Sequence, residues 1–150
     1  MCTASPTAPD RFDSSCCQTL FMKVLHRRDQ IVPLLDRISV DLCNADYPAR
    51  AITGVRLALE EAIVNAIQHG NNRDATKCVF VSFRVGAEQF VAQVQDEGAG
   101  FDPAAVPDPT LPENLVKPSG RGLLLMREFM TWIEFSAGGA CVTMCKRRPN

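Results

Sequence analysis

The organisation of the chain is decided by residues 59–70, LEEAIVNAIQHG. The apolar residues of this stretch recur at intervals of three and four, the spacing that places side chains on one face of a helix. Glu61 and Asn65 stand one helical turn apart, and His69 follows at the same interval. These polar side chains therefore form a row beside the apolar face. On spacing alone, the row is either a solvated helix edge or the rim of a binding site.

The same apolar spacing extends toward the N-terminus and predicts a longer helix. Pro48 suits the first turn of this helix, and Gly70 followed by an Asn-Asn pair is typical of its end. A preceding amphipathic helix is predicted over residues 29–46, where apolar residues again recur every three or four positions. Tyr47 and Pro48 separate the two helices.

Strands are predicted on both sides of this helical pair, because apolar and polar residues alternate there. Two of them, 77–85 and 89–96, are joined by three residues and form an antiparallel hairpin. A Gly-Gly pair marks a second hairpin near the C-terminus. This order of elements favours an α+β two-layer sandwich, with helices on one face of a mostly antiparallel sheet. The remaining predicted elements are a strand at 18–24, a helix at 120–130, and strands at 132–136 and 140–146.

The chain has the length of one domain. Its 150 residues, 46% of them hydrophobic, are enough for a single core. Residues 1–17 carry few large apolar groups and are expected to be a loose lead-in, whereas residues 18–150 form one domain. Residues 98–120 hold half of the ten prolines, which argues against regular structure and predicts a lid that covers a ligand.

Charge and cysteine content narrow the function classes. A net charge of −1 supplies no global basic field for nucleic acid or an anionic membrane. No apolar run is long enough to cross a bilayer and no signal-peptide core is present, so we expect a cytoplasmic protein. The seven cysteines include no CxxC pair and are expected to be reduced. Cys141 and Cys145 share one strand face, which permits metal binding but more simply indicates core packing.

The first of two glycine-rich motifs follows a predicted strand. In VQDEGAGFDP, residues 94–103, Asp96 ends the strand and is followed by Gly98 and Gly100. A carboxylate at this point can accept hydrogen bonds from a purine amino group, and the glycines let a flat ligand approach the backbone. A glycine-rich turn without a ligand is the alternative.

The second glycine-rich motif, SGRGLLLM at residues 119–126, opens a predicted helix with Gly120, Arg121 and Gly122. Free N–H groups at a helix start hold phosphate, and the guanidinium adds a forked donor. A helix that merely begins with glycine is the alternative. Neither GxxxxGK[ST] nor a GxGxxG motif in a parallel βαβ unit is present, so the two common nucleotide-binding folds fit poorly.

The order of these motifs resembles a known family. A helix with Glu61 and Asn65, then DxGxG after a strand, a proline-rich segment and a GxG helix start closely resemble the N, G1 and G2 boxes of the GHKL superfamily. This superfamily has the Bergerat, or histidine kinase-like ATPase, fold. EEAIVNAIQHGN and SGRGLLLMREFM are especially similar to its small branch, the anti-sigma factor serine/threonine kinases of bacterial partner-switching systems. The resemblance covers residues 18–147.

The resemblance implies that the ligands are ATP and Mg²⁺, and it assigns roles to individual residues. Asn65 would coordinate Mg²⁺, and Glu61 would act as the catalytic base toward a substrate serine or threonine. Glu60 is the competing carboxylate, but it does not stand one turn before Asn65. Asp96 would bind the adenine amino group. The other residues implied to bind ATP are Gly98, Gly100, Gly120, Arg121 and Gly122.

The activity implied by the resemblance is that of an ATP-dependent serine/threonine protein kinase acting as an anti-sigma factor-type regulator. Its expected substrate is a STAS-domain anti-sigma factor antagonist, with a sigma factor or another regulator as a further partner. Homodimers are common in this branch, and neither nucleic acid nor a membrane is an expected partner. The alternative is a non-catalytic module that sequesters a regulatory partner when ATP orders the lid.

Overall fold

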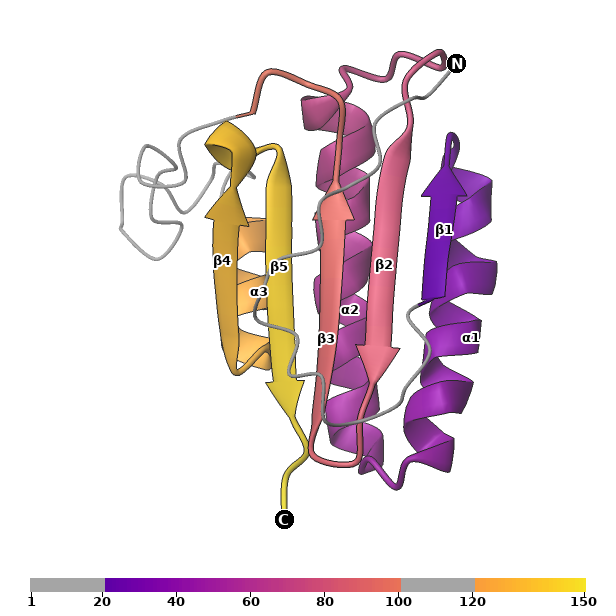
Figure 1. The fold of residues 1–150 in the computed structure, drawn as a ribbon, viewed down its shortest axis with the longest axis vertical. Coiled ribbons are helices and arrows are strands. Elements are labelled where there is room, and N and C mark those ends of the chain that lie inside the picture. Colours follow the sequence, from indigo (N-terminus) through magenta and orange to yellow (C-terminus); the bar gives the residue numbers. More distant parts are fainter. Residues whose placement is uncertain (1–20, 101–120) are drawn as a thin grey trace.

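A computed structural model describes residues 21–100 and 121–150 of the protein, which form the two layers seen in Figure 1. The strands are β1 (Phe21–Leu25), β2 (Val79–Val85), β3 (Gln89–Gln95), β4 (Trp132–Ser136) and β5 (Cys141–Arg147). The helices are α1 (Ile31–Asn44), α2 (Ala49–Asn65) and α3 (Arg121–Phe129). Shorter turns are π-helical at Ala66–Gly70 and 3₁₀ at Arg28–Gln30 and Ala137–Gly139.

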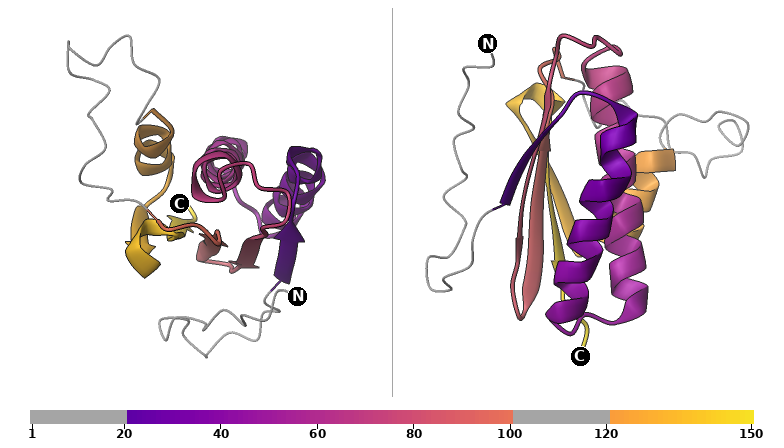
Figure 2. Two further views of the ribbon diagram at one scale, coloured as in Figure 1. Left: turned by 90° about the horizontal axis from the view of Figure 1, so that it is seen from above. Right: turned by 90° about the vertical axis from the view of Figure 1, so that its right-hand side faces the viewer.

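The strands of the described residues form one sheet in the order β1-β2-β3-β5-β4, and every neighbouring pair is antiparallel. The helices α1, α2 and α3 all lie on one face of this sheet (Figure 2). The predicted α+β sandwich is therefore confirmed. The strand β3 lies beside β5 rather than β4, so the chain crosses over through α3 and β4 before it returns to the middle of the sheet.

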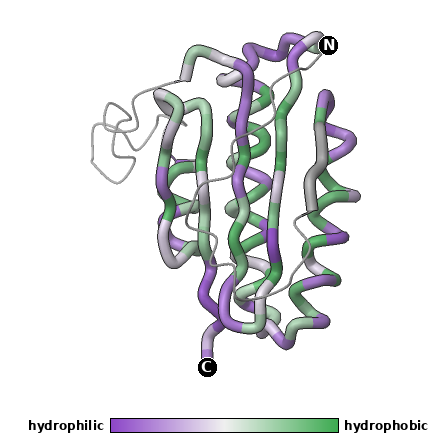
Figure 3. The backbone as a smooth tube through the Cα atoms, in the orientation of Figure 1, coloured by the Kyte–Doolittle hydropathy of each residue, from purple (hydrophilic) through white to green (hydrophobic). Residues whose placement is uncertain are grey.

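The core lies between the sheet and the helices. Phe90, Ala92 and Val94 of β3 are buried against it, and the strand register places Val81 opposite Val94 and Met144 opposite Ala92. Figure 3 shows hydrophobic and hydrophilic residues alternating along α1 and α2, the pattern expected of helices with one buried face. The apolar residues of the alternating pattern that predicted the central strands are thus the residues that pack them against the helices.

The helix boundaries differ from the predicted ones in small ways. α1 begins at Ile31, after a 3₁₀ turn, and α2 ends as an α-helix at Asn65, where a π-helical turn continues to Gly70. Pro48 is the N-cap of α2 rather than a residue of its first turn, because its ψ of 149° is still extended. The predicted lead-in at 1–17 and most of the predicted lid, 101–120, lie outside the described residues.

The cysteines of β5 are buried, but on the face of the sheet that is turned away from the helices. Cys141 pairs with Gln95 and Cys145 with Val91, whereas Met144 belongs to the core that faces the helices. Both thiols are free, and no group of three or more His, Cys, Asp or Glu side chains gathers within the described ranges. In the same part of the chain, no helix is long and apolar enough to cross a membrane.

Candidate functional site

The polar row of α2 is present as expected. Glu61 and Asn65 are partly exposed, whereas Ala62 and Ile63 between them are buried in the core. His69 is exposed and lies in the π-helical turn beyond the end of α2. In that turn the Asn71 N–H donates to the Ala66 carbonyl at 2.8 Å. π-helical turns are frequent at functional sites, and this one lies between the predicted site residues of α2 and those that follow β3.

The start of α3 lies directly against this row. A methyl group added at Gly122 would stand 2.5 Å from Glu61 Oε2 and 3.3 Å from Asn65 Nδ2. A side chain at position 122 would therefore displace Glu61, and only glycine leaves that carboxylate where it is. Arg121, the neighbouring residue, is exposed. Gly120 lies outside the described residues.

Asp96 and the loop after β3 lie against the π-helical turn. A methyl group at Gly70 would overlap the Asp96 carboxylate, and one at Gly98 would overlap the Gly70 carbonyl oxygen. Gly98 N–H also donates to Asp96 Oδ1 at 2.7 Å. The two glycines are thus required by the close approach of two backbone segments, as well as by any ligand.

Burial raises the pKa of the Asp96 carboxyl above its ordinary value. The hydrogen bond from Gly98 N–H and the positive charge of Lys77 act in the opposite direction, but burial is the larger effect. Oδ1 takes the Gly98 N–H, and Oδ2 accepts no hydrogen bond from the described residues. A half-buried carboxylate that uses only one oxygen toward the described residues is suited to accept a hydrogen bond from a ligand N–H with the other.

A residue that the sequence did not single out holds this loop in place. Asn71 is 2% exposed, its Oδ1 accepts the Glu97 N–H at 2.8 Å, and its Nδ2 donates to the Cys78 carbonyl at 2.9 Å. The Glu97 carboxylate in turn accepts the Cys78 N–H at 2.6 Å. These three bonds join the end of the π-helical turn, the start of β2 and the loop after Asp96. Because Glu97 directly follows Asp96, these bonds also hold Asp96 in position.

Gly100 does not approach α2 but lies against the turn between β4 and β5. Its φ of +79° lies in the left-handed region, and a methyl group there would overlap the Gly138 carbonyl oxygen. The glycine therefore lets the end of the loop cross the turn between β4 and β5. This contact accounts for a glycine at position 100 without a ligand, and its role at ATP stays a prediction.

Five of the predicted site residues come together along the last part of α2 and the π-helical turn, whereas Gly100 lies at the turn between β4 and β5. Glu61, Asn65 and Gly122 meet at one level, and Asp96 with Gly98 meets the helix at Gly70. Glu61 and Gly70 are nine positions apart, a rise of roughly 13 Å along the helix. The arrangement places the Glu61 carboxylate and the Asn65 amide at one end of this stretch and the Asp96 carboxylate at the other.

Comparison with known proteins agrees with the fold. The family model described as the histidine kinase-like ATPase domain matches residues 27–146. The chain is 29% identical over 100 residues to the anti-sigma F factor of Clostridium perfringens, a match that covers 65% of this chain and 71% of the relative. It is 34% identical over 97 residues to the anti-sigma F factor of Geobacillus thermodenitrificans, covering 62% and 65% of the two chains. The serine/threonine-protein kinase BtrW of Bordetella bronchiseptica is 29% identical over 91 residues, covering 59% and 64%.

Proposed function

The chain belongs to the histidine kinase-like ATPase domain family, and from this premise we propose that it is an ATP-dependent serine/threonine protein kinase of the anti-sigma factor type. The ATPase domain implies ATP binding, and the names of the relatives support an anti-sigma factor-type kinase. The observation that carries the proposal is the meeting of Glu61 and Asn65 with Gly122, because it brings a carboxylate and an amide to the start of a helix that can hold phosphate.

The adenine end of the proposed site is formed by Asp96. Its free Oδ2 would accept the hydrogen bond of the adenine amino group, while Gly98 N–H keeps the other oxygen in place. The glycines at 70 and 98 fit this role, because a side chain at either position would push the carboxylate or its loop away. Asn71 then acts as a positioning residue for the same loop.

The phosphate end is formed by the opposite part of the site. The chemistry that Mg²⁺ would supply there is neutralisation of the phosphate charge. The residue of this chain that would hold it is Asn65, since an amide oxygen is a ligand type that magnesium accepts, and magnesium keeps several waters. The backbone at Gly122 and the exposed Arg121 would contact the phosphates, together with Gly120.

Glu61 is proposed to handle the substrate proton. Its carboxylate would accept the hydroxyl proton of a serine or threonine as the hydroxyl oxygen attacks the γ-phosphorus and the bond to ADP breaks. The geometry favours Glu61 over Glu60, because Glu61 lies against Gly122 whereas Glu60 is exposed. The proposed protein substrate is a STAS-domain anti-sigma factor antagonist, the proposed second partner is a sigma factor, and the proposed assembly is a homodimer.

Phosphate transfer from labelled ATP to the cognate STAS protein tests the proposal. The variant Glu61→Gln should lower the transfer rate by about 10²- to 10⁴-fold while it still binds ATP, since no phosphate ligand is removed. The matched control Glu60→Gln changes the same group one position away and should transfer at nearly the wild-type rate. ATP-dependent partner binding without any transfer in the wild type would instead establish the non-catalytic module.

A further inference from the structure

A cavity of about 360 Å³ lies where β1 leads into α1, and the residues proposed to bind ATP or to catalyse transfer do not line it. Its apolar part is formed by Leu25, Ile67 and Val79, two of which belong to the core. The rest of its wall comes from the bend after β1 and from the loop between the π-helical turn and β2. The volume falls within the range of small-molecule sites. The polar and small lining residues are His26, Arg27, Arg28, Gln68, Asn71, Arg73, Asp74, Ala75 and Lys77.

The wall of this cavity is basic, with four cationic side chains against the single carboxylate of Asp74. That carboxylate is engaged locally, because Asp74 Oδ1 accepts the Thr76 N–H at 2.9 Å and the Thr76 hydroxyl at 2.6 Å. Arg28, Arg73 and Lys77 form no ion pair within the described residues. Three cations around one cavity are therefore left without a salt-bridge partner in that part of the chain, although the net charge of the whole is −1.

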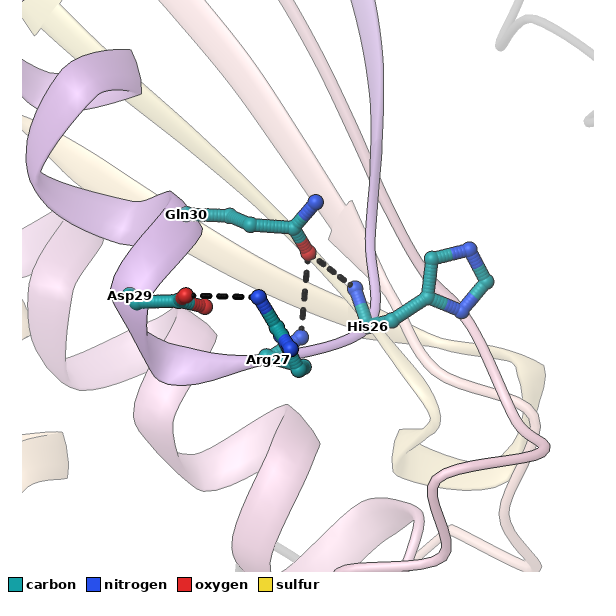
Figure 4. Close-up of polar contacts among 4 residues, drawn as sticks. All are labelled: His26, Arg27, Asp29 and Gln30. Carbon is teal, nitrogen blue, oxygen red and sulfur yellow. Dashed lines mark hydrogen bonds and ion pairs between the residues drawn. The ribbon is translucent and has the colours of Figure 1, made fainter.

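The bend that carries part of this charge is fixed by its own hydrogen bonds (Figure 4). Gln30 Oε1 accepts the N–H groups of His26 and Arg27 at 2.8 and 3.1 Å, and the Arg27 guanidinium pairs with Asp29 at 2.8 Å. Figure 4 shows the His26 ring on the other side of the chain from Gln30. There a His26 ring nitrogen lies 3.6 Å from Cys78 Sγ at the start of β2. The cavity wall is thus held before any ligand arrives.

The opposite wall is held in a less common backbone conformation. Asn72 and Arg73 have φ values of 50° and 59°, in the left-handed region that non-glycine residues rarely adopt. The Arg73 N–H donates to the Ile67 carbonyl at 2.9 Å, which closes the turn beside the cavity. Such backbone conformations persist where the surrounding structure fixes them, often at ligand sites.

We propose that this cavity binds a small anion that carries carboxylate or phosphate groups on a compact body. Arg28, Arg73 and Lys77 would neutralise the anionic groups, and the apolar wall would take the rest of the molecule. This goes beyond the proposed kinase reaction, because the residues differ. Asn71 lines the cavity and also holds Glu97 N–H beside Asp96, so occupation of the cavity is linked to the base-binding end of the ATP site.

Calorimetric titration with citrate and with inorganic phosphate, at constant ionic strength and with saturating Mg·ADP present, tests the proposal. The wild type should bind at least one of the two anions saturably. The double variant Arg28→Gln/Arg73→Gln should bind it at least tenfold more weakly. The matched control Arg50→Gln/Arg148→Gln removes the same charge near the other end of α2 and should bind like the wild type. Lys77→Gln provides a second cavity variant should the double variant fail to fold.

Two results would overturn the proposal. Equal affinity in the cavity variants and the wild type would mean that the anion binds elsewhere, for example at the phosphate end of the ATP site. In the second result, neither small anion binds, but an acidic peptide binds tightly and its binding depends on Arg28 and Arg73. The cavity would then be a protein-docking surface instead. Because the readout is anion binding, it remains informative even if phosphate transfer is absent.

Discussion

The two ends of the sheet are built in different ways. The site end, residues 70–78 and 95–100, holds its segments together by close backbone approaches and by the buried amide of Asn71. The hairpin end, around Gly86, is joined to the α1–α2 connection by Tyr47, whose hydroxyl donates to the Gly86 carbonyl at 2.9 Å. The site end carries a half-buried carboxylate, whereas the hairpin end is anchored by one aromatic side chain that is 4% exposed.

The two ends therefore differ in how fully their polar groups are satisfied. A single large aromatic side chain stabilises through apolar burial and one hydrogen bond, with nothing left unsatisfied. The site end keeps a desolvated carboxylate with an unused oxygen, an arrangement that lowers stability unless a ligand is bound. Its glycines and amide hold that carboxylate in place. We therefore expect substitutions at the site end to have the larger structural effects.

The largest effect is expected for Gly98→Ala. The new methyl group would overlap the Gly70 carbonyl oxygen, and a backbone atom cannot rotate away as a flexible side chain can. We expect a loss of roughly 3 kcal/mol or more in the free energy of unfolding, measured by urea denaturation. Ala99→Ser changes the exposed neighbouring position and should be close to neutral. Wild-type stability in Gly98→Ala would show that the loop moves freely.

The next largest effect is expected for Asn71→Ala. The substitution leaves the part-buried N–H of Glu97 and the buried carbonyl of Cys78 without their side-chain partner, at a cost of about 2 to 3 kcal/mol. It should also weaken ATP binding, because the loop after Asp96 loses its anchor. The matched variant Asn72→Gly removes the same amide at an exposed neighbour, where glycine adopts the φ of 50° freely, and should change stability far less. Equal effects at the two positions would contradict the role of the buried amide.

A smaller effect is expected at the hairpin end for Tyr47→Phe. One hydrogen bond is lost and the ring remains, so we expect a decrease of about 1 kcal/mol and unchanged ATP binding. Burial raises the pKa of Tyr47 to about 12, from an ordinary value of 10.0. The folded state therefore loses stability as pH rises from 10.0 toward about 12, since the unfolded chain ionises first.

Tyr47 is the single tyrosine of the chain, so the ultraviolet absorbance of tyrosinate reports its ionisation alone. In the folded protein the absorbance should rise near pH 12, and in urea it should rise near pH 10. Coincident curves for the folded and unfolded protein would show that the hydroxyl is accessible to solvent.

The sequence predicted most of the fold, because both the strands and the helices follow simple apolar periods. It also placed Glu61, Asn65 and Asp96 at one site, but through the order of three motifs and the resemblance that they support. No single spacing carried that conclusion. The structure adds the contact that joins the motifs, since Gly122 meets Glu61 across residues that are 61 positions apart.

The role of Asn71 could not be predicted from the sequence. An Asn that follows a glycine at the end of a helix usually indicates a helix terminus exposed to solvent. The local sequence is the same when the amide is buried. Its partners are seven and 26 residues away, beyond the reach of local propensity. The burial of Cys141 on the outer face of the sheet also depends on which strands become neighbours, and this order was not predicted.

The smallest effect, and one of opposite sign, is expected for Asp96→Asn. Burial raises the pKa of this carboxyl, so keeping it ionised destabilises the folded protein at neutral pH, and an amide removes that penalty. The amide oxygen of the new side chain can still accept the Gly98 N–H. We expect a modestly higher Tm than wild type at pH 7 and a difference that shrinks as pH falls toward 3.8, the ordinary value, where the wild-type carboxyl is protonated as well.

ATP binding should weaken in the same variant, because an amide can present an N–H where the carboxylate presented an oxygen. A lower Tm at pH 7 would mean that the hydrogen bond from Gly98 and the charge of Lys77 outweigh burial, and the site end would then be stabilised by its carboxylate.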